Sequence, residues 1–383
     1  MELENLFHKD VLRQFREIVW GDLITYSHLI EEVELPVNKE KKIFWLARKD
    51  KRNYLLKDHL YEKIPIVPVE TEKYTHRQKV YYLVKKYRSF KIRPRKTMSF
   101  RELVDTFCPY EHSSPEHYTL LKLIAISSLT SRINVRVSTP SNFGKTAVFE
   151  ALSYLYPQIS IVNPRSLPAL EYRLSSKVLV LDELSNLESG QTQLVQNFLL
   201  RVGDFSSKYE KSTRGNVGLG TQDTYDISKL SVVILYNHLS QYTDHSKFFD
   251  NMFPNPKAIH SRFLPLRLDG KLSMKTFAQF TLKYLQPPKL KDEEINTLKD
   301  FLRGLWYFMQ SPNADYHRYS FPDFPEFLTD RHLLSYNIIL HEIDRYCENE
   351  EEFNFFVNVL NDSIKSYYKM VNISPKISGL GGW

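Results

Sequence analysis

The stretch Ile133–Thr146, INVRVSTPSNFGKT, decides the fold of this chain. It begins with alternating β-prone residues, continues through small and turn-forming residues, and ends in Gly144-Lys145-Thr146 ahead of the helical pattern AVFEAL. A strand, a tight loop, Gly-Lys-Thr and a helix follow one another in this order in phosphate-binding loops. In such a loop, backbone N–H groups and the start of the helix hold phosphate oxygens. The pattern predicts that Lys145 reaches the β- and γ-phosphates of a nucleotide and that Thr146 is a ligand of Mg²⁺.

The loop departs from the pattern G-x-x-x-x-G-K-[ST] at one position, because Thr139 stands where the first Gly is expected. Thr139 fits this place if its backbone φ angle is negative. The residues expected to surround the phosphates are Thr139, Pro140, Ser141, Asn142, Phe143, Gly144, Lys145 and Thr146. Taken alone, the stretch also fits an ordinary strand-to-helix turn that carries Gly-Lys-Thr by chance, so the segments downstream decide between the two interpretations.

A second informative segment is KVLVLDEL, residues 177–184, an apolar run that ends in Asp182 and Glu183. Such runs are typical of central parallel strands that are covered on both faces, and ligands of open α/β sheets bind at the carboxyl ends of the strands. Carboxylates at a buried strand end need partners. We therefore expect Asp182 to bind Mg²⁺ and Glu183 to activate the attacking water. Asp182 follows Lys145 by 37 residues, and this spacing makes the two motifs together more specific than either alone.

Three further polar residues at the ends of elements are candidates for the same site. Asn237 ends the strand pattern LSVVILYN and could orient the attacking water, although strands commonly end in Asn. Arg262 comes 25 residues later, where it could stabilise transition-state charge on a neighbouring subunit's γ-phosphate or cap the end of a helix. Arg331 lies in the first turn of a helix that Thr329 is expected to cap. It either contacts nucleotide from a lid or belongs to a solvated face.

Composition sets broad limits on the chain. Its 383 residues are 42% hydrophobic and 25% charged, which is ordinary for a globular protein and enough for two or three domains. No apolar run approaches the 18 residues of a membrane span. The two cysteines lie far apart, which argues against a disulfide framework and predicts a reducing setting, cytoplasmic or nucleoid-associated. The formal net charge of +7 is consistent with a polyanionic partner.

The patterns predict an α/β fold in three parts. They are an N-terminal basic α+β module (1–105), a parallel-sheet nucleotide-binding core (106–271) and a C-terminal helical lid with a tail (272–383). In the first part, basic residues interleave with aromatic ones, as in proteins that neutralise phosphates and stack bases, or as on a solvated helix face. A Gly-rich insertion at 208–228 adds further basic residues. The side chains expected to contact nucleic acid are Lys85, Lys86, Arg88, Arg93, Arg95, Lys208, Lys211 and Arg214.

Taken in order, these motifs resemble those of AAA+ ATPases. The phosphate loop, Asp182-Glu183, Asn237, Ser261-Arg262-Phe263 and Arg331 would be Walker A, Walker B, sensor 1, the arginine finger and sensor 2. The chain looks most similar to the replicative helicase branch, meaning the minichromosome-maintenance proteins and the viral superfamily 3 helicases. That branch carries a hairpin inserted before sensor 1, and residues 208–228 occupy this place. The resemblance covers about residues 110–345; the Thr at 139 and the short distance between the two Walker motifs depart from it.

The resemblance implies a ring-forming helicase or translocase, a hexamer that acts on DNA in replication and hydrolyses ATP with Mg²⁺ between subunits. The compact, Lys- and Tyr-rich chain suggests a viral or mobile-element origin. A first alternative is an AAA+ ATPase that loads, remodels or switches protein partners, which predicts hydrolysis stimulated by protein and not by DNA. A second is a non-catalytic nucleic-acid-binding scaffold with a decayed phosphate loop. Thr139 favours this second alternative, whereas the intact Lys145, Thr146, Asp182 and Glu183 count against it.

Overall fold

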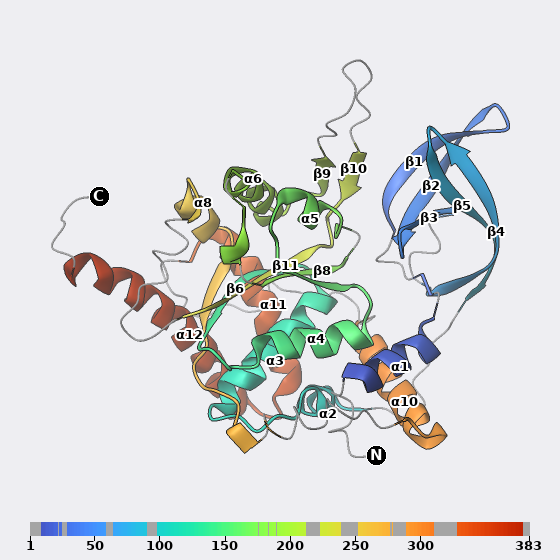
Figure 1. The fold of residues 1–383 in the computed structure, drawn as a ribbon. Coiled ribbons are helices and arrows are strands. Elements are labelled where there is room, and N and C mark those ends of the chain that lie inside the picture. Colours follow the sequence, from blue (N-terminus) through green and yellow to red (C-terminus); the bar gives the residue numbers. More distant parts are fainter. Residues whose placement is uncertain are drawn as a thin grey trace.

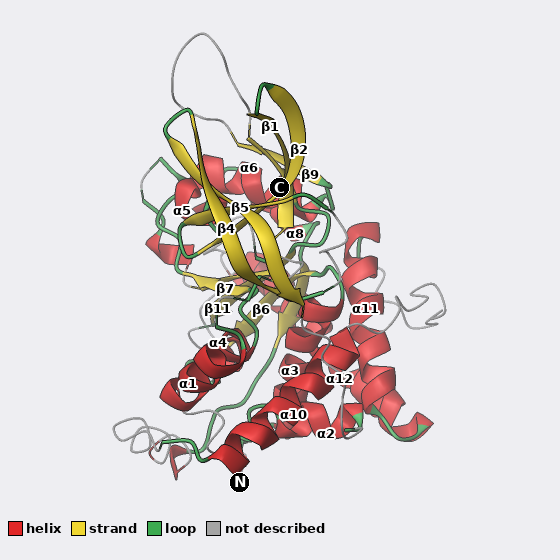
Figure 2. Ribbon diagram, turned by 90° about the vertical axis from the view of Figure 1, so that its right-hand side faces the viewer, coloured by secondary structure: helices red, strands yellow, loops and turns green. Residues whose placement is uncertain are grey.

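The computed structural model describes most of the chain. The described residues are 9–21, 23–24, 29–58, 64–89, 98–174, 176–182, 184–188, 190–211, 223–238, 252–275, 278, 289–309 and 328–377. They form a small β-module beside a larger α/β body, with the first strands on the right of the view in Figure 1. Seen from the side, the strands of the β-module curve over the upper half of the molecule, while helices fill the lower half (Figure 2).

The β-module is a five-stranded sheet in the order β1-β2-β3-β5-β4. All its pairings are antiparallel except that of β3 with β5, which is parallel. Its strands are β1 (Leu29–Val37), β2 (Glu40–Lys49), β3 (Arg52–Leu56), β4 (Ile66–His76) and β5 (Lys79–Ser89). Two-residue turns join β1 to β2, β2 to β3 and β4 to β5, and both residues of each turn have positive φ. This is the geometry that hairpins with right-handed strand twist require.

The body is built on a five-stranded sheet in which every pairing is parallel, in the order β12-β6-β11-β8-β7. Its strands are β6 (Asn134–Thr139), β7 (Ile159–Val162), β8 (Val178–Asp182), β11 (Ser231–Asn237) and β12 (Leu264–Arg267). The strands β6, β8 and β11 are almost fully buried, as expected for the central strands of a sheet covered on both faces. The predicted α/β class with a parallel sheet is therefore confirmed.

Helices cover both faces of this sheet (Figure 1). One layer holds α3 (Pro115–Thr130), α4 (Lys145–Leu155), α11 (Asp330–Tyr346) and α12 (Glu350–Ile377), and the other holds α5 (Leu167–Glu171), α6 (Thr192–Gly203) and α8 (Pro256–His260). Alternate residues of one strand enter different cores, because successive side chains point to opposite faces. Val178 and Val180 pack in the first core, whereas Leu179 and Leu181 pack in the second. A short 3₁₀ helix, Leu184–Asn186, follows β8.

The main core extends across the boundaries expected at residues 105 and 271. The helix α1 (Lys9–Val19) packs on α4, while α2 (Phe100–Thr106) and α10 (Asp292–Met309) contribute to the same core. The C-terminal helices also belong to it, because α12 packs along β12 and the Ser335 hydroxyl accepts a hydrogen bond from the Asn134 N–H. Helices α11 and α12 thus form a layer of the α/β body. The expected division into a core (106–271) and a helical lid with a tail (272–383) stays a prediction.

A two-stranded hairpin, β9 (Lys208–Lys211) with β10 (Asp223–Asp226), stands between α6 and β11. Residues 212–222 at its tip lie outside the described residues. The hairpin contacts β1 of the β-module, and the Arg48 guanidinium on the adjacent strand β2 donates to the Tyr225 hydroxyl at 2.8 Å. No helix among the described residues is long and apolar enough to cross a bilayer.

Candidate functional site

The candidate site lies at the carboxyl edge of the parallel sheet, where the loop after β6 leads into α4. Two residues of this loop are left-handed, Asn142 with φ 60° and Gly144 with φ 88°. A Cβ on Gly144 would lie 3.0 Å from the Cδ1 atom of Leu272, so both backbone and packing favour glycine there. Thr139 ends β6 in extended conformation and is not among the residues with positive φ. The condition under which Thr139 fits the loop is therefore met.

Two pairs of side chains meet at this edge, each joining the first turn of α4 to the end of a strand, β8 or β11. Lys145 Nζ donates to Asn237 Oδ1, and Thr146 Oγ1 donates to Asp182 Oδ2 at 2.9 Å. The pairs come together because β11 lies between β6 and β8, with Asn237 beside Thr139 and Leu235 beside Asp182. Lys145 is only 8% exposed. A cation, a hydroxyl, an amide and a carboxylate therefore converge next to a helix start, which is a place suited to anions.

The same groups fit Mg²⁺ that arrives with a nucleotide. Among the residues that the structure describes, no three His, Cys, Asp or Glu side chains gather to hold a metal ion unaided. Mg²⁺ commonly takes one or two protein oxygens and completes its octahedron with phosphate oxygens and waters. The Thr146 hydroxyl and the Asp182 carboxylate, already in contact, are ligands of the required kind. Glu183, the expected base, lies outside the described residues.

A series of polar contacts that the sequence did not predict supports the loop at its first residue, Thr139. His238 N donates to the Thr139 carbonyl at 2.8 Å. Its ring bridges Ser138 Oγ at 3.0 Å and Asp269 Oδ1 at 3.2 Å. The hydrogen bond from His238 is the main reason that the pKa of Asp269 lies below its ordinary value. These contacts join the ends of β6, β11 and β12; their only signal in the sequence is a polar residue following each apolar strand.

On its outer side, the loop is held by two segments from elsewhere in the chain. The His112 ring nitrogen Nε2 lies 3.2 Å from the Phe143 carbonyl, and its ring stacks on Tyr118 with centroids 4.9 Å apart. Burial lowers the pKa of His112, which favours a neutral ring that donates to this carbonyl. A Cβ on Gly270 would lie 2.6 Å from the His112 ring, so glycine permits this close packing. Leu272 N donates to the Asn142 carbonyl at 3.1 Å.

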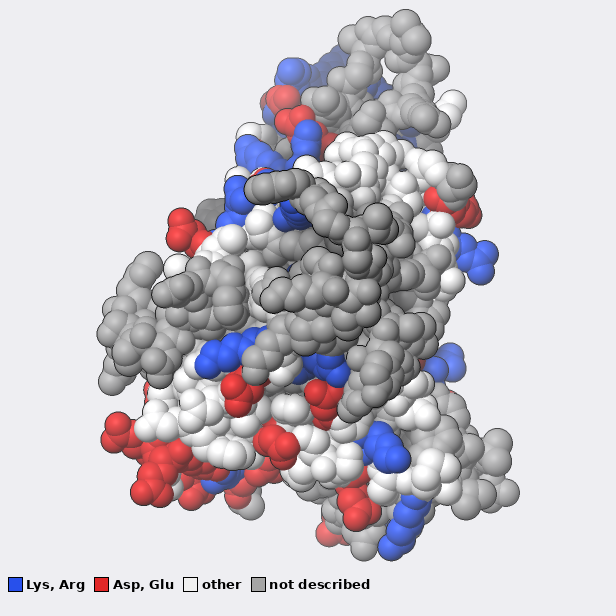
Figure 3. Space-filling model, turned by 90° about the vertical axis from the view of Figure 1, so that its left-hand side faces the viewer, with Lys and Arg blue, Asp and Glu red and all other residues white. Residues whose placement is uncertain are grey.

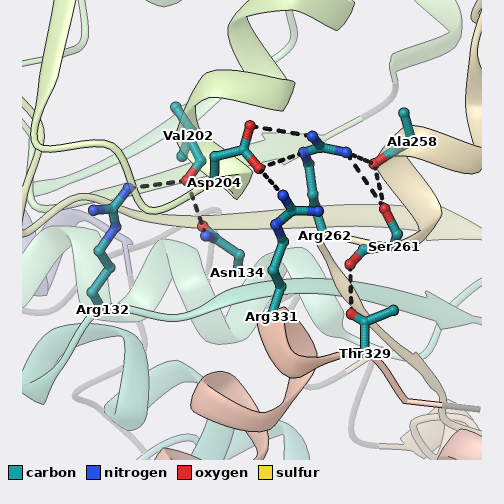
Figure 4. Close-up of polar contacts among 9 residues, drawn as sticks. All are labelled: Arg132, Asn134, Val202, Asp204, Ala258, Ser261, Arg262, Thr329 and Arg331. Atoms are coloured by element: carbon teal, nitrogen blue, oxygen red, sulfur yellow. Dashed lines mark hydrogen bonds and ion pairs between the residues drawn. The ribbon is translucent and has the colours of Figure 1, made fainter.

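The two predicted arginines meet at a different place, as Figure 4 shows. Arg262 makes two hydrogen bonds to Asp204, from Nε at 2.9 Å and from Nη2 at 3.2 Å. Arg331 Nη2 lies 2.9 Å from the same carboxylate. We call these three residues the arginine cluster. It stands where α6 ends, beside the turn between α8 and β12 and the first turn of α11.

The arginine cluster lies at the edge of the sheet opposite to the phosphate loop. Arg262 comes just before β12, which runs parallel to β6, whereas the loop follows the last residue of β6. β6 has six residues, and at about 3.3 Å per residue it separates the two edges by roughly 20 Å. Neither arginine reaches Lys145 of its own chain. Whether Arg331 contacts a nucleotide, as expected, or only pairs with Asp204 stays a prediction.

The residues expected to contact nucleic acid are spread over two elements. On β5, Lys85 pairs with Glu72 at 2.5 Å, while Lys86 and Arg88 are exposed. Lys208 is exposed at the start of β9. Figure 3 shows basic side chains over the upper part of one face of the molecule and acidic ones gathered along its lower edge. Arg93, Arg95, Arg214 and the side chain of Lys211 lie outside the described residues.

Comparison with known proteins identifies no family for this chain. No family model matches the chain, and no curated protein matches it either. The side chains at the two edges of the sheet are therefore the basis for a proposed function.

Proposed function

We propose that this protein is an ATPase of the AAA+ type that acts as a ring-forming DNA helicase or translocase. One observation carries the ATPase part of the proposal: the paired contacts Lys145–Asn237 and Thr146–Asp182 at the ends of three adjacent parallel strands. The four side chains come from three segments that lie far apart in the sequence, and they have the chemistry of a phosphate loop, a metal-binding carboxylate and a water-orienting amide. A chance Gly-Lys-Thr turn gives no reason for Asp182 and Asn237 to meet it.

In the proposed mechanism, the loop N–H groups and the start of α4 bind the β-phosphate of ATP. Lys145 then leaves Asn237 for the β- and γ-phosphate oxygens, which frees the Asn237 amide to orient a water molecule. Thr146 and Asp182 would hold Mg²⁺, which supplies positive charge against the phosphate oxygens. Glu183 would accept the proton of the attacking water. Burial of Lys145 keeps water away from its charge and strengthens its interaction with phosphate.

The position of the arginines supports a site shared between subunits. Because Arg262 and Arg331 stand at the edge opposite to Lys145, they would serve a nucleotide bound to another copy of the chain. A guanidinium supplied in trans stabilises the charge that develops on the transferred phosphoryl group, and it typically raises the rate by about 10³-fold or more. Each subunit of a closed ring would then give its arginines to one neighbour and receive those of the other.

DNA is proposed as the polyanion from the distribution of charge. The exposed Lys86, Arg88 and Lys208 lie on the β-module and on the hairpin, and Arg48–Tyr225 connects these two elements. Basic side chains that follow a strand can neutralise successive phosphates. Movement of the hairpin during hydrolysis would then move the nucleic acid.

The test is ATP hydrolysis by the wild type, Lys145→Ala and Glu183→Gln across protein concentration, with and without single-stranded DNA. We expect a rate per subunit that rises with protein concentration, increases with DNA, and is lost in both variants. Lys291→Ala, which removes an exposed lysine outside the site, serves as the control and should behave as wild type. Hydrolysis that ignores DNA but responds to a protein would favour the remodelling alternative. Neither binding nor hydrolysis of ATP in the wild type would refute the ATPase proposal.

A further inference from the structure

The arginine cluster contains one carboxylate for two guanidinium groups. Asp204 accepts from Nε and Nη2 of Arg262 and lies 2.9 Å from Nη2 of Arg331 (Figure 4). The three side chains are accessible, with 16%, 35% and 45% exposure for Arg262, Asp204 and Arg331. Guanidinium forks bind phosphate with the same paired geometry that they use for carboxylate. A phosphate group and Asp204 would therefore compete for the same N–H groups.

The orientation of Arg262 does not depend on Asp204 alone. Its third nitrogen, Nη1, donates to the Ala258 carbonyl at 2.8 Å, so the guanidinium stays anchored to α8 when the carboxylate leaves. Gly203 allows Arg262 to pack against α6, because a Cβ there would lie 2.7 Å from the Arg262 Cβ. The first turn of α11, which carries Arg331, is tied to the same turn because the Thr329 hydroxyl donates to the Ser261 carbonyl at 2.7 Å. The two arginines thus form one unit.

Asp204 is fixed by the end of α6. Its N–H donates to the Leu200 carbonyl at 2.9 Å, and the Val202 carbonyl accepts from Arg132 at 2.9 Å and from Asn134 at 3.2 Å. Arg132 also donates to the Ser206 carbonyl at 3.0 Å, in the short segment that leads from Asp204 into β9. A shift of Asp204 would therefore displace both the arginine pair and the base of the hairpin.

We propose that Asp204 is a positioning residue that holds Arg262 and Arg331 as a single phosphate-binding pair and yields them to the terminal phosphate of a nucleotide on a second copy of the chain. This inference rests on the proposed ATPase function with a shared site. In the free chain, Asp204 neutralises part of the cluster charge and keeps both guanidinium groups pointing to the same spot. On assembly, the polyphosphate displaces it, and the competition sets how readily a neighbour's nucleotide engages the pair.

Mixing two variants isolates this exchange. The donor subunit carries Lys145→Ala, so it cannot hold nucleotide, and keeps the arginine pair. The acceptor subunit carries Arg262→Ala with Arg331→Ala and keeps its phosphate loop. Neither should hydrolyse ATP alone, and donor should restore hydrolysis to acceptor. Adding Asp204→Asn to the donor should lower, by about tenfold, the donor concentration at which the acceptor reaches half of its maximal hydrolysis rate. The substitution removes a charged group that competes with phosphate for the N–H groups of the arginine pair. Asp204→Glu, which keeps a carboxylate, should stay near the parent donor.

A second readout is independent of catalysis. The donor alone should bind inorganic tripolyphosphate several-fold more tightly with Asp204→Asn than without it, as measured by titration calorimetry. Asp226→Asn, a change of a carboxylate outside the cluster, should leave both readouts unchanged. If Asp204 only braces the helices, Asp204→Asn will lower Tm, leave tripolyphosphate affinity unchanged and raise the donor requirement. That result overturns the inference.

The mixing experiment also separates the two proposals. If the parent donor restores hydrolysis but Asp204→Asn shifts neither readout, the inference fails and the shared-site ATPase stands. If wild-type chains do not hydrolyse ATP, or the parent donor never restores the acceptor, the proposed shared site fails and this inference falls with it.

Discussion

Within the phosphate loop, Asn142 and Gly144 occupy the left-handed region and Thr139 does not. Thr139 is fully buried, and its carbonyl accepts a hydrogen bond from the His238 N–H. Glycine at the start of such a loop supplies conformational freedom that this backbone does not use. This backbone therefore does not require glycine at position 139, whereas it favours glycine at position 144.

We expect Thr139→Gly to keep nucleotide binding and Gly144→Ala to abolish it. Thr139→Gly should cost about 1 kcal/mol of unfolding free energy or somewhat more, through chain entropy and a lost buried side chain. Gly144→Ala forces a Cβ to within 3.0 Å of Leu272 at φ 88°, so the loop must move. Binding of a fluorescent ATP analogue and urea unfolding of both variants measure these effects. Tighter nucleotide binding by Thr139→Gly would contradict this account of the loop.

His238 is a second residue whose structural role can be measured, through the free energy of unfolding. Replacing it with Leu leaves Ser138 and Asp269 without their ring partner, while the His238 N–H bond to Thr139 stays. An unpaired buried polar group costs about 1–3 kcal/mol, so His238→Leu should lower the unfolding free energy by that order. It should also lower the rate of ATP hydrolysis more than ATP affinity, because Asn237 adjoins it. His238→Gln, which can still reach Asp269, should recover part of the loss. Equal effects of Leu and Gln would contradict the role of the hydrogen bonds.

At the scale of elements, the start of α11 is held by a histidine in an uncharged form. His332 Nδ1 accepts from the Thr329 N–H, and Nε2 donates to the His260 carbonyl at 2.8 Å. This leaves no place for a second ring proton. Burial lowers the pKa of His332 to about 4 and that of His260 to about 2. Both rings are therefore neutral in the folded protein at neutral pH.

The direction of the pH effect follows from these lowered pKa values. Above pH 6.5 His332 is neutral in both folded and unfolded chains, so its full contribution to the free energy of unfolding is present. Between pH 6.5 and about 4 only the unfolded chain takes up the proton. Stability should fall over this window by up to about 3 kcal/mol from His332 alone. His332→Gln, which keeps a capping side chain, should make this part of the curve of Tm against pH less steep, and the lowered pKa of His260 accounts for the slope that remains. Thr329→Ala should lower Tm by a similar amount at every pH, and a pH-dependent loss in that control would contradict the assignment.

Elements were easier to predict from this sequence than their partners. The strand β6 follows an alternating β-prone pattern, β8 and β11 are mostly apolar, and the order Lys145, Asp182, Asn237 placed their ends at one edge. The packing of α11 on β6 depends on Ser335 and Asn134, which are 201 residues apart and carry no local pattern. The same holds for the arginine cluster, because an aspartate that ends a helix does not indicate which arginines it binds. The helical lid was expected from family resemblance, which gave no sign of the contacts that α11 and α12 make with the sheet.

At the scale of the whole molecule, a side-chain hydrogen bond joins the β-module to the hairpin of the α/β body. Arg48 donates to the Tyr225 hydroxyl at 2.8 Å, lies 5.2 Å from the centre of its ring, and pairs with Glu31 at 3.1 Å. Tyr225 is 1% exposed and packs in the second core of the body. The contact therefore links a side chain of the basic module with the buried base of the hairpin, and no segment of the sequence predicted it.

If DNA binding on the β-module is passed to the ATPase through this contact, Tyr225→Phe should reduce the stimulation of hydrolysis by single-stranded DNA several-fold. The ring and its packing remain, and only the hydroxyl that accepts from Arg48 is lost, so hydrolysis without DNA should change little. Tyr209→Phe is the matched control: Tyr209 lies on the other strand of the hairpin, and its hydroxyl donates to Glu171 within the body at 2.9 Å. That variant should lose stability but keep its response to DNA. A fall in DNA stimulation of the same size in both variants would mean that hairpin stability, and not the Arg48–Tyr225 contact, transmits the signal.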